Sequence, residues 1–201
     1  MGATSLAVAG LVGLDRRIAL WSADTQPGEA LISGAIGWLD LLVLKEISTF
    51  LLGALLLIAA GIALSNRRAR RPGWLILYLA LVHFLATAIA DLSKPLFGRL
   101  RPYEAMADGG LQDIWFVSAN AFPSGHTAFY AGLCFPLALL LPRWSLLWLL
   151  PPLFIAFARV VEHDHYLSDV SASLALAALL SIGFEFIRRK GTGAEPMVAA
   201  D

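Results

Sequence analysis

Long apolar runs separated by short polar segments dominate the chain from residue 46 to residue 187. A membrane-spanning helix needs about 20 predominantly apolar residues, with about 17 tolerated. Five runs reach or approach this length, at residues 46–65, 74–93, 127–142, 144–161 and 169–187. Hydrocarbon offers no partners to exposed backbone groups, and an open sheet cannot close its edges in so short a chain. The pattern therefore predicts an all-α fold, a polytopic membrane helix bundle with five clear spans.

The amino-terminal part of the chain has a weaker pattern. Residues 5–14 are apolar but too short to cross a membrane alone, so they predict a short or tilted sixth span or an interfacial helix. Residues 22–29 predict a break, and residues 30–44 an apolar, interfacial helix. The chain thus divides into short or interfacial helices at 1–45, a transmembrane core at 46–190 and a cytoplasmic tail at 191–201.

Composition agrees with a membrane protein. Hydrophobic residues make up 58% of the chain and charged residues only 15%, whereas a soluble domain is about half apolar and about a quarter charged. The formal net charge of zero excludes a broadly basic nucleic-acid binder. Cys134 is the single cysteine, which rules out an intrachain disulfide.

Basic residues fix the expected topology. The connection at 66–73 carries four arginines, and the basic cluster at 188–190 follows the last span, so both are expected in the cytoplasm. Counting spans from these points places the loop at 103–121 on the opposite face, together with the polar segment at 158–169. The sequence thus predicts a multi-pass membrane protein whose three polar segments meet on the periplasmic or extracellular side, outside the cytoplasm.

Three polar segments lie where apolar runs end. They are KPLFGRLRP at 94–102, FPSGHT at 122–127 and ARVVEHDHYLSD at 158–169. Lys94, Arg101 and Arg159 supply cations that suit the oxygens of a phosphate, since phosphoryl transfer depends on positioning and charge stabilisation. Ser124 and Gly125 precede an apolar helix, where free backbone amides favour an anion. These five residues are predicted to bind phosphate.

The same segments contain candidates for the chemical steps. His165 and Asp169 are four residues apart, which puts them on one face if the last helix extends back that far. The carboxylate could then orient the imidazole as a covalent nucleophile, giving a phosphohistidine that water cleaves. His126, from the second segment, is suited to protonate the leaving oxygen.

These segments resemble the signature of the type 2 phosphatidic acid phosphatase (PAP2) superfamily of membrane phosphatases, KxxxxxxRP, PSGH and SRxxxxxHxxxD. The matches are Lys94–Pro102, Pro123–His126 and Ala158–Asp169, with Ala158 in place of serine. The resemblance covers residues 46–187 and implies a six-helix core. It also implies hydrolysis of an amphiphilic lipid phosphate without a metal or another cofactor. The implied roles are His165 as nucleophile, Asp169 as its orienting partner and His126 as acid.

The substrate and the reaction class stay open at this point. Candidate lipids are phosphatidic acid, phosphatidylglycerol phosphate, undecaprenyl pyrophosphate and a lipid A phosphate. A phosphohistidine could also pass its phosphate to an alcohol, which would make the protein a lipid phosphotransferase. A non-catalytic lipid transporter or binding protein is a further alternative, although the repeated halves and midplane charges typical of transporters are not visible. The oligomeric state is not indicated.

Several polar residues allow a structural interpretation beside a functional one. Lys45 fits an interfacial anchor, and Arg99 fits either a further phosphate contact or a cation that faces headgroups. His83, inside an apolar run, is either functional or hydrogen-bonded to a neighbouring helix. Asp91 could pair with a cation of the first segment. Residues 162–164, Glu-His-Asp, resemble a metal cluster without a second ligand set.

Overall fold

The computed structural model describes residues 13–25, 28–111 and 114–192. Over these ranges the chain is helical and contains no strand, which confirms the all-α fold class. The α-helices are α2 (Asp15–Thr25), α3 (Glu29–Leu42), α4 (Leu51–Ser65), α5 (Arg70–Phe97), α6 (Pro102–Ala107), α7 (Gly125–Leu140), α8 (Ser145–Val161) and α9 (Leu167–Thr192). Short 3₁₀ turns at Arg67–Ala69 and Pro142–Trp144 precede α5 and α8.

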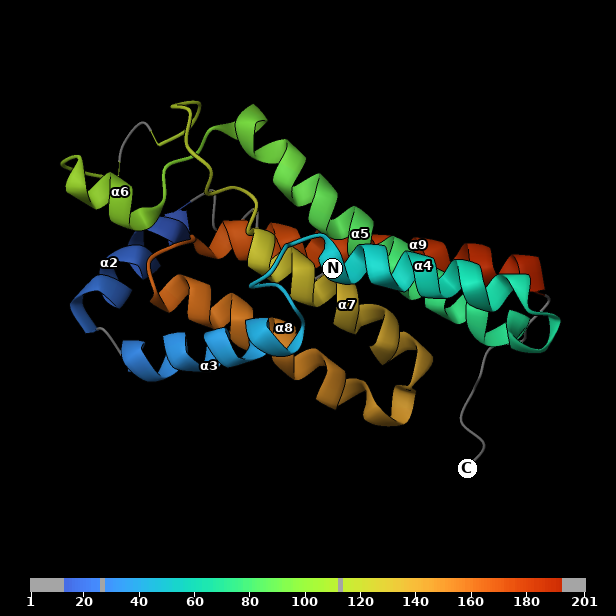
Figure 1. Ribbon diagram of the computed structural model, residues 1–201. Helices are drawn as coiled ribbons and strands as arrows, with labels where there is room; N and C mark the ends of the chain where they lie inside the picture. Colours follow the sequence, from blue (N-terminus) through green and yellow to red (C-terminus); the bar gives the residue numbers. More distant parts are fainter. Residues whose placement is uncertain (1–12, 26–27, 112–113, 193–201) are drawn as a thin grey trace.

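Helix α7 lies at the centre of the bundle and packs against α5, α8 and α9, while α4 runs along α5 (Figure 1). Gly132 permits the close crossing of α7 and α5. A Cβ atom at this position would lie 3.0 Å from the Ala86 Cβ and 3.1 Å from the His83 Cα. Small residues let helix backbones approach closely in membranes, where van der Waals contact replaces a hydrophobic driving force.

Three stretches of the described chain reach membrane-spanning length. Residues 67–107, 142–161 and 167–190 are long and apolar enough to cross a membrane, by length and composition. Helices α4 and α7, of 15 and 16 residues, are apolar but shorter. All five predicted runs are therefore helical, and the two short ones require a locally thin bilayer to cross. Large apolar side chains such as Leu146 and Leu179 lie on the outside, as expected for a surface that faces lipid.

The amino-terminal helices differ in part from the prediction. Helix α2 continues through residues 22–25, which were predicted to be a break, because Asp15, Ala19 and Ser22 form a buried face against the core. Tertiary packing has here overridden weak local propensity. Helix α3 begins after Gly28, whose φ of 67° is left-handed, and covers most of the predicted helix at 30–44. The apolar stretch at 5–14 lies almost wholly outside the described residues.

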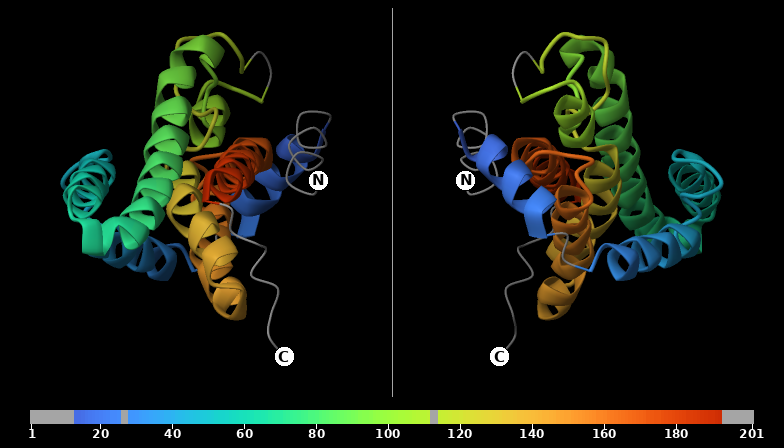
Figure 2. Two further views of the ribbon diagram at one scale, coloured as in Figure 1. Left: turned by 90° about the vertical axis from the view of Figure 1, so that its right-hand side faces the viewer. Right: turned by 90° about the vertical axis from the view of Figure 1, so that its left-hand side faces the viewer.

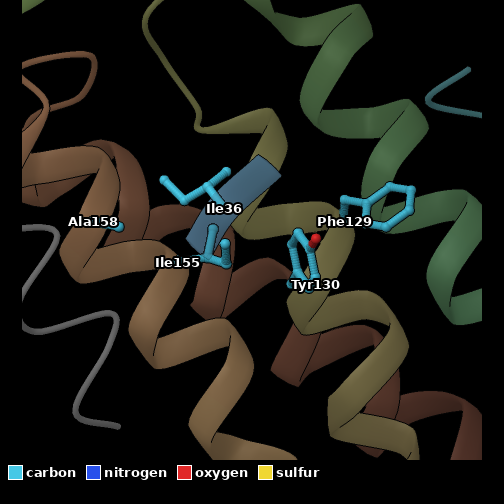
Figure 3. Close-up of a cluster of buried hydrophobic side chains, with 5 residues drawn as sticks. All are labelled: Ile36, Phe129, Tyr130, Ile155 and Ala158. Atoms are coloured by element: carbon cyan, nitrogen blue, oxygen red, sulfur yellow. The ribbon is translucent and has the colours of Figure 1, made fainter. Parts of the chain in front are cut away.

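A buried apolar cluster fastens α3 to the core. Figure 3 shows its members, which come from α3, α7 and α8: Ile36, Phe129, Tyr130, Ile155 and Ala158. Phe129 and Tyr130 lie one turn after His126, and Ala158 directly precedes Arg159. The views in Figure 2 place α2 and α3 along the outside of the bundle. The cluster thus holds an amino-terminal helix against the end of the bundle that carries the second and third polar segments.

Candidate functional site

The first and second polar segments meet at Lys94 and Gly125. Lys94, in the last turn of α5, donates from Nζ to Oδ1 of Asp91 over 2.6 Å, which confirms the predicted pairing. A Cβ atom on Gly125 would lie 3.0 Å from the Lys94 Nζ and 3.1 Å from the Asp91 Oδ1. A side chain at the first residue of α7 would press against this ion pair, and glycine leaves room for the lysine there. The contact places a cation beside the free amides of a helix amino terminus.

The second and third segments meet through backbone contacts. Ser124 caps α7, since its Oγ accepts hydrogen bonds from the backbone N–H and the hydroxyl of Thr127. The Ser124 N–H donates to the carbonyl of Asp169, and the Ser173 hydroxyl donates to the carbonyl of Ser124 over 2.8 Å. Because Ser124 is fully buried, these bonds fix the start of α7 against the start of α9.

Two arginines share one carboxylate. Nη1 of Arg101 lies 3.2 Å from Oδ1 of Asp164, and Nη2 of Arg159 pairs with the other oxygen of Asp164. Arg159 also pairs with Glu162 over 2.7 Å, and Glu162 accepts a hydrogen bond from Ser33 of α3. Arg101 and Arg159 thus lie on either side of the Asp164 carboxylate, an anion that both guanidinium groups bind.

Residues 162–164 do not form the metal cluster that the sequence allowed. The carboxylates of Glu162 and Asp164 are paired with arginine, as above. Among the described residues there is no group of three histidine, cysteine or acidic side chains placed to hold a metal ion. The segment instead forms a tight turn, in which His163 has a φ of 59° and its carbonyl accepts from the N–H of Tyr103.

His165 and Asp169 are close, but a turn, not a helix, brings them together. Helix α9 begins at Leu167, after His165. The Asp169 Oδ2 accepts from the backbone N–H of Tyr166 over 2.9 Å and lies 3.4 Å from Nδ1 of His165. The backbone N–H of His165 donates to the carbonyl of Arg159. The His165 Nδ1 therefore faces the carboxylate, which leaves Nε2 as the nitrogen for chemistry.

The pKa of His165 lies below its ordinary value. Burial is the main cause, because a charged imidazole loses its hydration there, and the neighbouring arginines act in the same direction. Asp169 opposes the shift through its negative charge and hydrogen bonding. Burial outweighs the carboxylate, so His165 is neutral near pH 7, as an imidazole nucleophile must be.

A buried ionic network stands behind Asp169, and the sequence interpretation of Arg99 was wrong. Arg99 is 1% exposed. Its Nη1 pairs with Asp169, and its Nη2 pairs with Asp15 of α2 over 2.7 Å. The guanidinium lies between two aromatic rings, 4.3 Å from the Trp115 centroid and 3.9 Å from the Tyr166 centroid. Arg99 thus joins the amino-terminal helix to a candidate catalytic carboxylate instead of facing phosphate or headgroups.

The surroundings of His126 contain two residues that the sequence motifs do not include. The His126 Nε2 lies 3.0 Å from Oδ2 of Asp40 and 3.0 Å from Nζ of Lys45. The other oxygen of Asp40 accepts from the Tyr130 hydroxyl over 2.7 Å. Burial lowers the pKa of Lys45, although Asp40 opposes this. Lys45 is therefore part of the site and not an interfacial anchor.

The contacts of His83 support the structural role that the sequence allowed, a hydrogen bond to a neighbouring helix. Its Nδ1 lies 3.2 Å from the carbonyl of Phe129 on α7, and its ring meets the Phe129 ring edge-on. The contact is a hydrogen bond between neighbouring helices. His83 also packs close to Gly132, at the crossing of α5 and α7.

Comparisons with known proteins find a matching family and two similar relatives. A sequence model of the PAP2 superfamily matches residues 73–190, more than half of the 201 residues. The lipid A 1-phosphatase of Rhizobium johnstonii is 31% identical over 124 residues, which are 60% of this chain and 50% of that protein. The lipid A 1-phosphatase of Rhizobium etli is also 31% identical over 124 residues, which are 53% of that protein. The chain spans about half the length of these curated relatives, and no solved structure gives a significant match.

Proposed function

The chain belongs to the PAP2 superfamily, and we propose that it is a membrane phosphatase that hydrolyses a lipid phosphomonoester or pyrophosphate. One observation carries the proposal most directly. Three segments far apart in the sequence bring together a histidine facing a carboxylate, a second histidine, and two arginines that pair with one carboxylate. Such groups are suited to nucleophilic transfer of a phosphoryl group.

The proposed reaction has two steps. The Nε2 of His165 attacks phosphorus while the bond to the leaving oxygen breaks, and His126 gives that oxygen a proton. Water then attacks the phosphohistidine as His126 removes its proton, and the bond between phosphorus and His165 breaks. Lys94, Arg101 and Arg159 stabilise the charge on the phosphoryl oxygens, together with the amides near Ser124 and Gly125.

The relatives suggest which lipid to test first. Both are named lipid A 1-phosphatase, so we propose a lipid A phosphate ahead of phosphatidic acid, phosphatidylglycerol phosphate and undecaprenyl pyrophosphate. Purified protein in mixed micelles should release inorganic phosphate from at least one of these lipids. Matched reactions with the His165→Ala variant give the background. Absence of release above that background from all four lipids would refute the proposal.

We propose that the site lies on the periplasmic or extracellular face of a bacterial inner membrane. The test uses a Cys134→Ala background with one new cysteine, Asp108→Cys in the loop after α6 or Ala69→Cys between α4 and α5. An impermeant thiol reagent applied to intact spheroplasts should label the first variant and spare the second. The reverse pattern would move the site to the cytoplasmic face.

A further inference from the structure

The carboxylate beside His126 comes from a helix that the family signature does not reach. Asp40 lies in α3, outside the matched residues 73–190. It is 7% exposed, and its two oxygens are used differently. Oδ1 accepts from the Tyr130 hydroxyl over 2.7 Å, and Oδ2 lies 3.0 Å from Nε2 of His126. Tyr130 thus fixes the carboxylate in the orientation that His126 meets.

The apolar cluster keeps Asp40 in place. Ile36 lies one turn before Asp40 on α3, and it packs with Tyr130 and Ile155 (Figure 3). A buried carboxylate costs several kcal/mol unless hydrogen bonds and charge compensate it. Tyr130, His126 and the nearby Lys45 provide that compensation. The surrounding side chains thus hold the Asp40 carboxylate in a defined position beside Nε2 of His126.

We infer that Asp40 is a positioning residue for His126, holding the hydrogen on Nε2 so that Nδ1 carries the proton given to the leaving oxygen. The inference rests on the proposed function. In the first step the imidazolium loses its Nδ1 proton to the leaving oxygen as the bond to phosphorus breaks. The neutral ring, still donating from Nε2 to Asp40, then accepts a proton on Nδ1 from the attacking water.

Lys45 competes with Asp40 for the same nitrogen. Its Nζ also lies 3.0 Å from the His126 Nε2, and an ammonium group can only donate. A ring that accepts from Lys45 at Nε2 cannot donate there to Asp40. A phosphate dianion offers Lys45, a flexible point charge, a stronger partner. Substrate binding therefore moves His126 toward the form that donates to Asp40 and carries an acidic proton on Nδ1.

The test exploits the chemistry of the leaving group. An alkoxide leaving group needs a proton from a general acid, whereas para-nitrophenolate leaves readily without one. The Asp40→Asn variant should lose about 10- to 100-fold in kcat/KM, which reports the steps up to departure of the leaving group, on the lipid phosphate that wild type hydrolyses fastest. On para-nitrophenyl phosphate it should lose less than about threefold, relative to wild type on each substrate. Glu46→Gln, which changes an exposed carboxylate in the turn that follows α3, is the matched control and should leave both rates unchanged.

A second variant keeps the test decisive if Asp40→Asn does not fold. Tyr130→Phe removes only the hydroxyl that holds Asp40, and it should give the same selective loss at a smaller size. Equal losses on both substrates, or no loss on either, in a folded variant would overturn the inference. Failure of wild type to release phosphate from any substrate would instead refute the proposed function, so the two outcomes are distinguishable.

Discussion

His165 and His126 each face a carboxylate, but the two carboxylates are held in different ways. Asp169 belongs to the same polar segment as His165 and lies 3.4 Å from its Nδ1. Asp40 lies 86 residues before His126 and is 3.0 Å from its Nε2. Asp169 is held in turn by a buried arginine that pairs with Asp15. His126 therefore contacts an amino-terminal helix directly, through Asp40. His165 depends on one indirectly, because Arg99 links Asp169 to α2.

The comparison separates two kinds of sequence information. The three motif segments supply the groups proposed to touch the phosphate. Helices α2 and α3, outside the residues that the family model matches, supply Asp15, which pairs with the arginine behind Asp169, and Asp40, which contacts His126. A chain reduced to the matched core would keep every signature residue and lose Asp15 and Asp40. The site is thus larger than its motifs.

The largest expected effect is on the two histidines themselves. His165→Ala and His126→Ala should each lower turnover of a lipid phosphate by about a thousandfold or more, because each removes a chemical role. Both variants should remain folded, since each removes little packing. The measurement is phosphate release by purified proteins whose thermal unfolding has been checked. Turnover close to wild type in either folded variant would remove that histidine from the mechanism.

Removing Arg99, which pairs with both Asp169 and Asp15, should lower the stability of the protein. Arg99→Gln leaves Asp15 and Asp169 buried without their cation, and loss of one partner of a buried pair costs about 3–5 kcal/mol. Arg16→Gln, on an exposed position of the same helix as Asp15, should change the free energy of unfolding by less than about 0.5 kcal/mol. Equilibrium denaturation in detergent compares the two. Equal stability of the two variants would contradict the structural role of Arg99.

The dependence on pH should be a smaller effect. The pKa of His165 is lowered by burial, with Asp169 opposing, and the neutral imidazole is the proposed nucleophile. Activity should therefore fall only as pH drops through a value below the ordinary histidine pKa of about 6.5. Asp169→Asn removes the opposing charge, so the acid limb of kcat/KM should move to still lower pH. A limb at or above the ordinary value would show that His165 is not the group titrating.

Chelation should have no effect. The proposed site stabilises phosphate with cations of the protein, so EDTA should leave phosphate release unchanged. Vanadate should inhibit, because it can take the place of phosphate beside the proposed phosphate-binding cations. Loss of activity with EDTA that a divalent ion restores would bring back a metal site, with Glu162 and Asp164 as the first residues to substitute.

Much of the fold could be predicted because membrane helices follow from apolar length. The five core helices lie where the runs of apolar residues are, and the ends of α5, α7 and α9 carry the three polar segments. The meeting of these segments also followed from the count of crossings. Lys94 beside Gly125 and Ser124 bonded to Asp169 show that they do converge.

The rest could not be predicted because it depends on single contacts between distant residues. Asp15 reaches Ser168 across 153 positions and Asp40 reaches His126 across 86. A lone carboxylate in a short helix has no spacing that signals its partner. Arg99 was misassigned for the same reason, since a cation inside a phosphate motif is most simply expected to face phosphate. Its burial depends on an acceptor supplied by α2.

The phosphohistidine intermediate is the centre of this account, and trapping it is the most direct test. The His126→Ala variant keeps the proposed nucleophile, His165, and lacks the group proposed to activate water. With radiolabelled para-nitrophenyl phosphate it should therefore accumulate label on the protein. After alkaline digestion and peptide mapping, the label should be acid-labile and located on His165. Turnover by the wild-type protein without any protein-bound label in this variant, or label on another residue, would contradict the account.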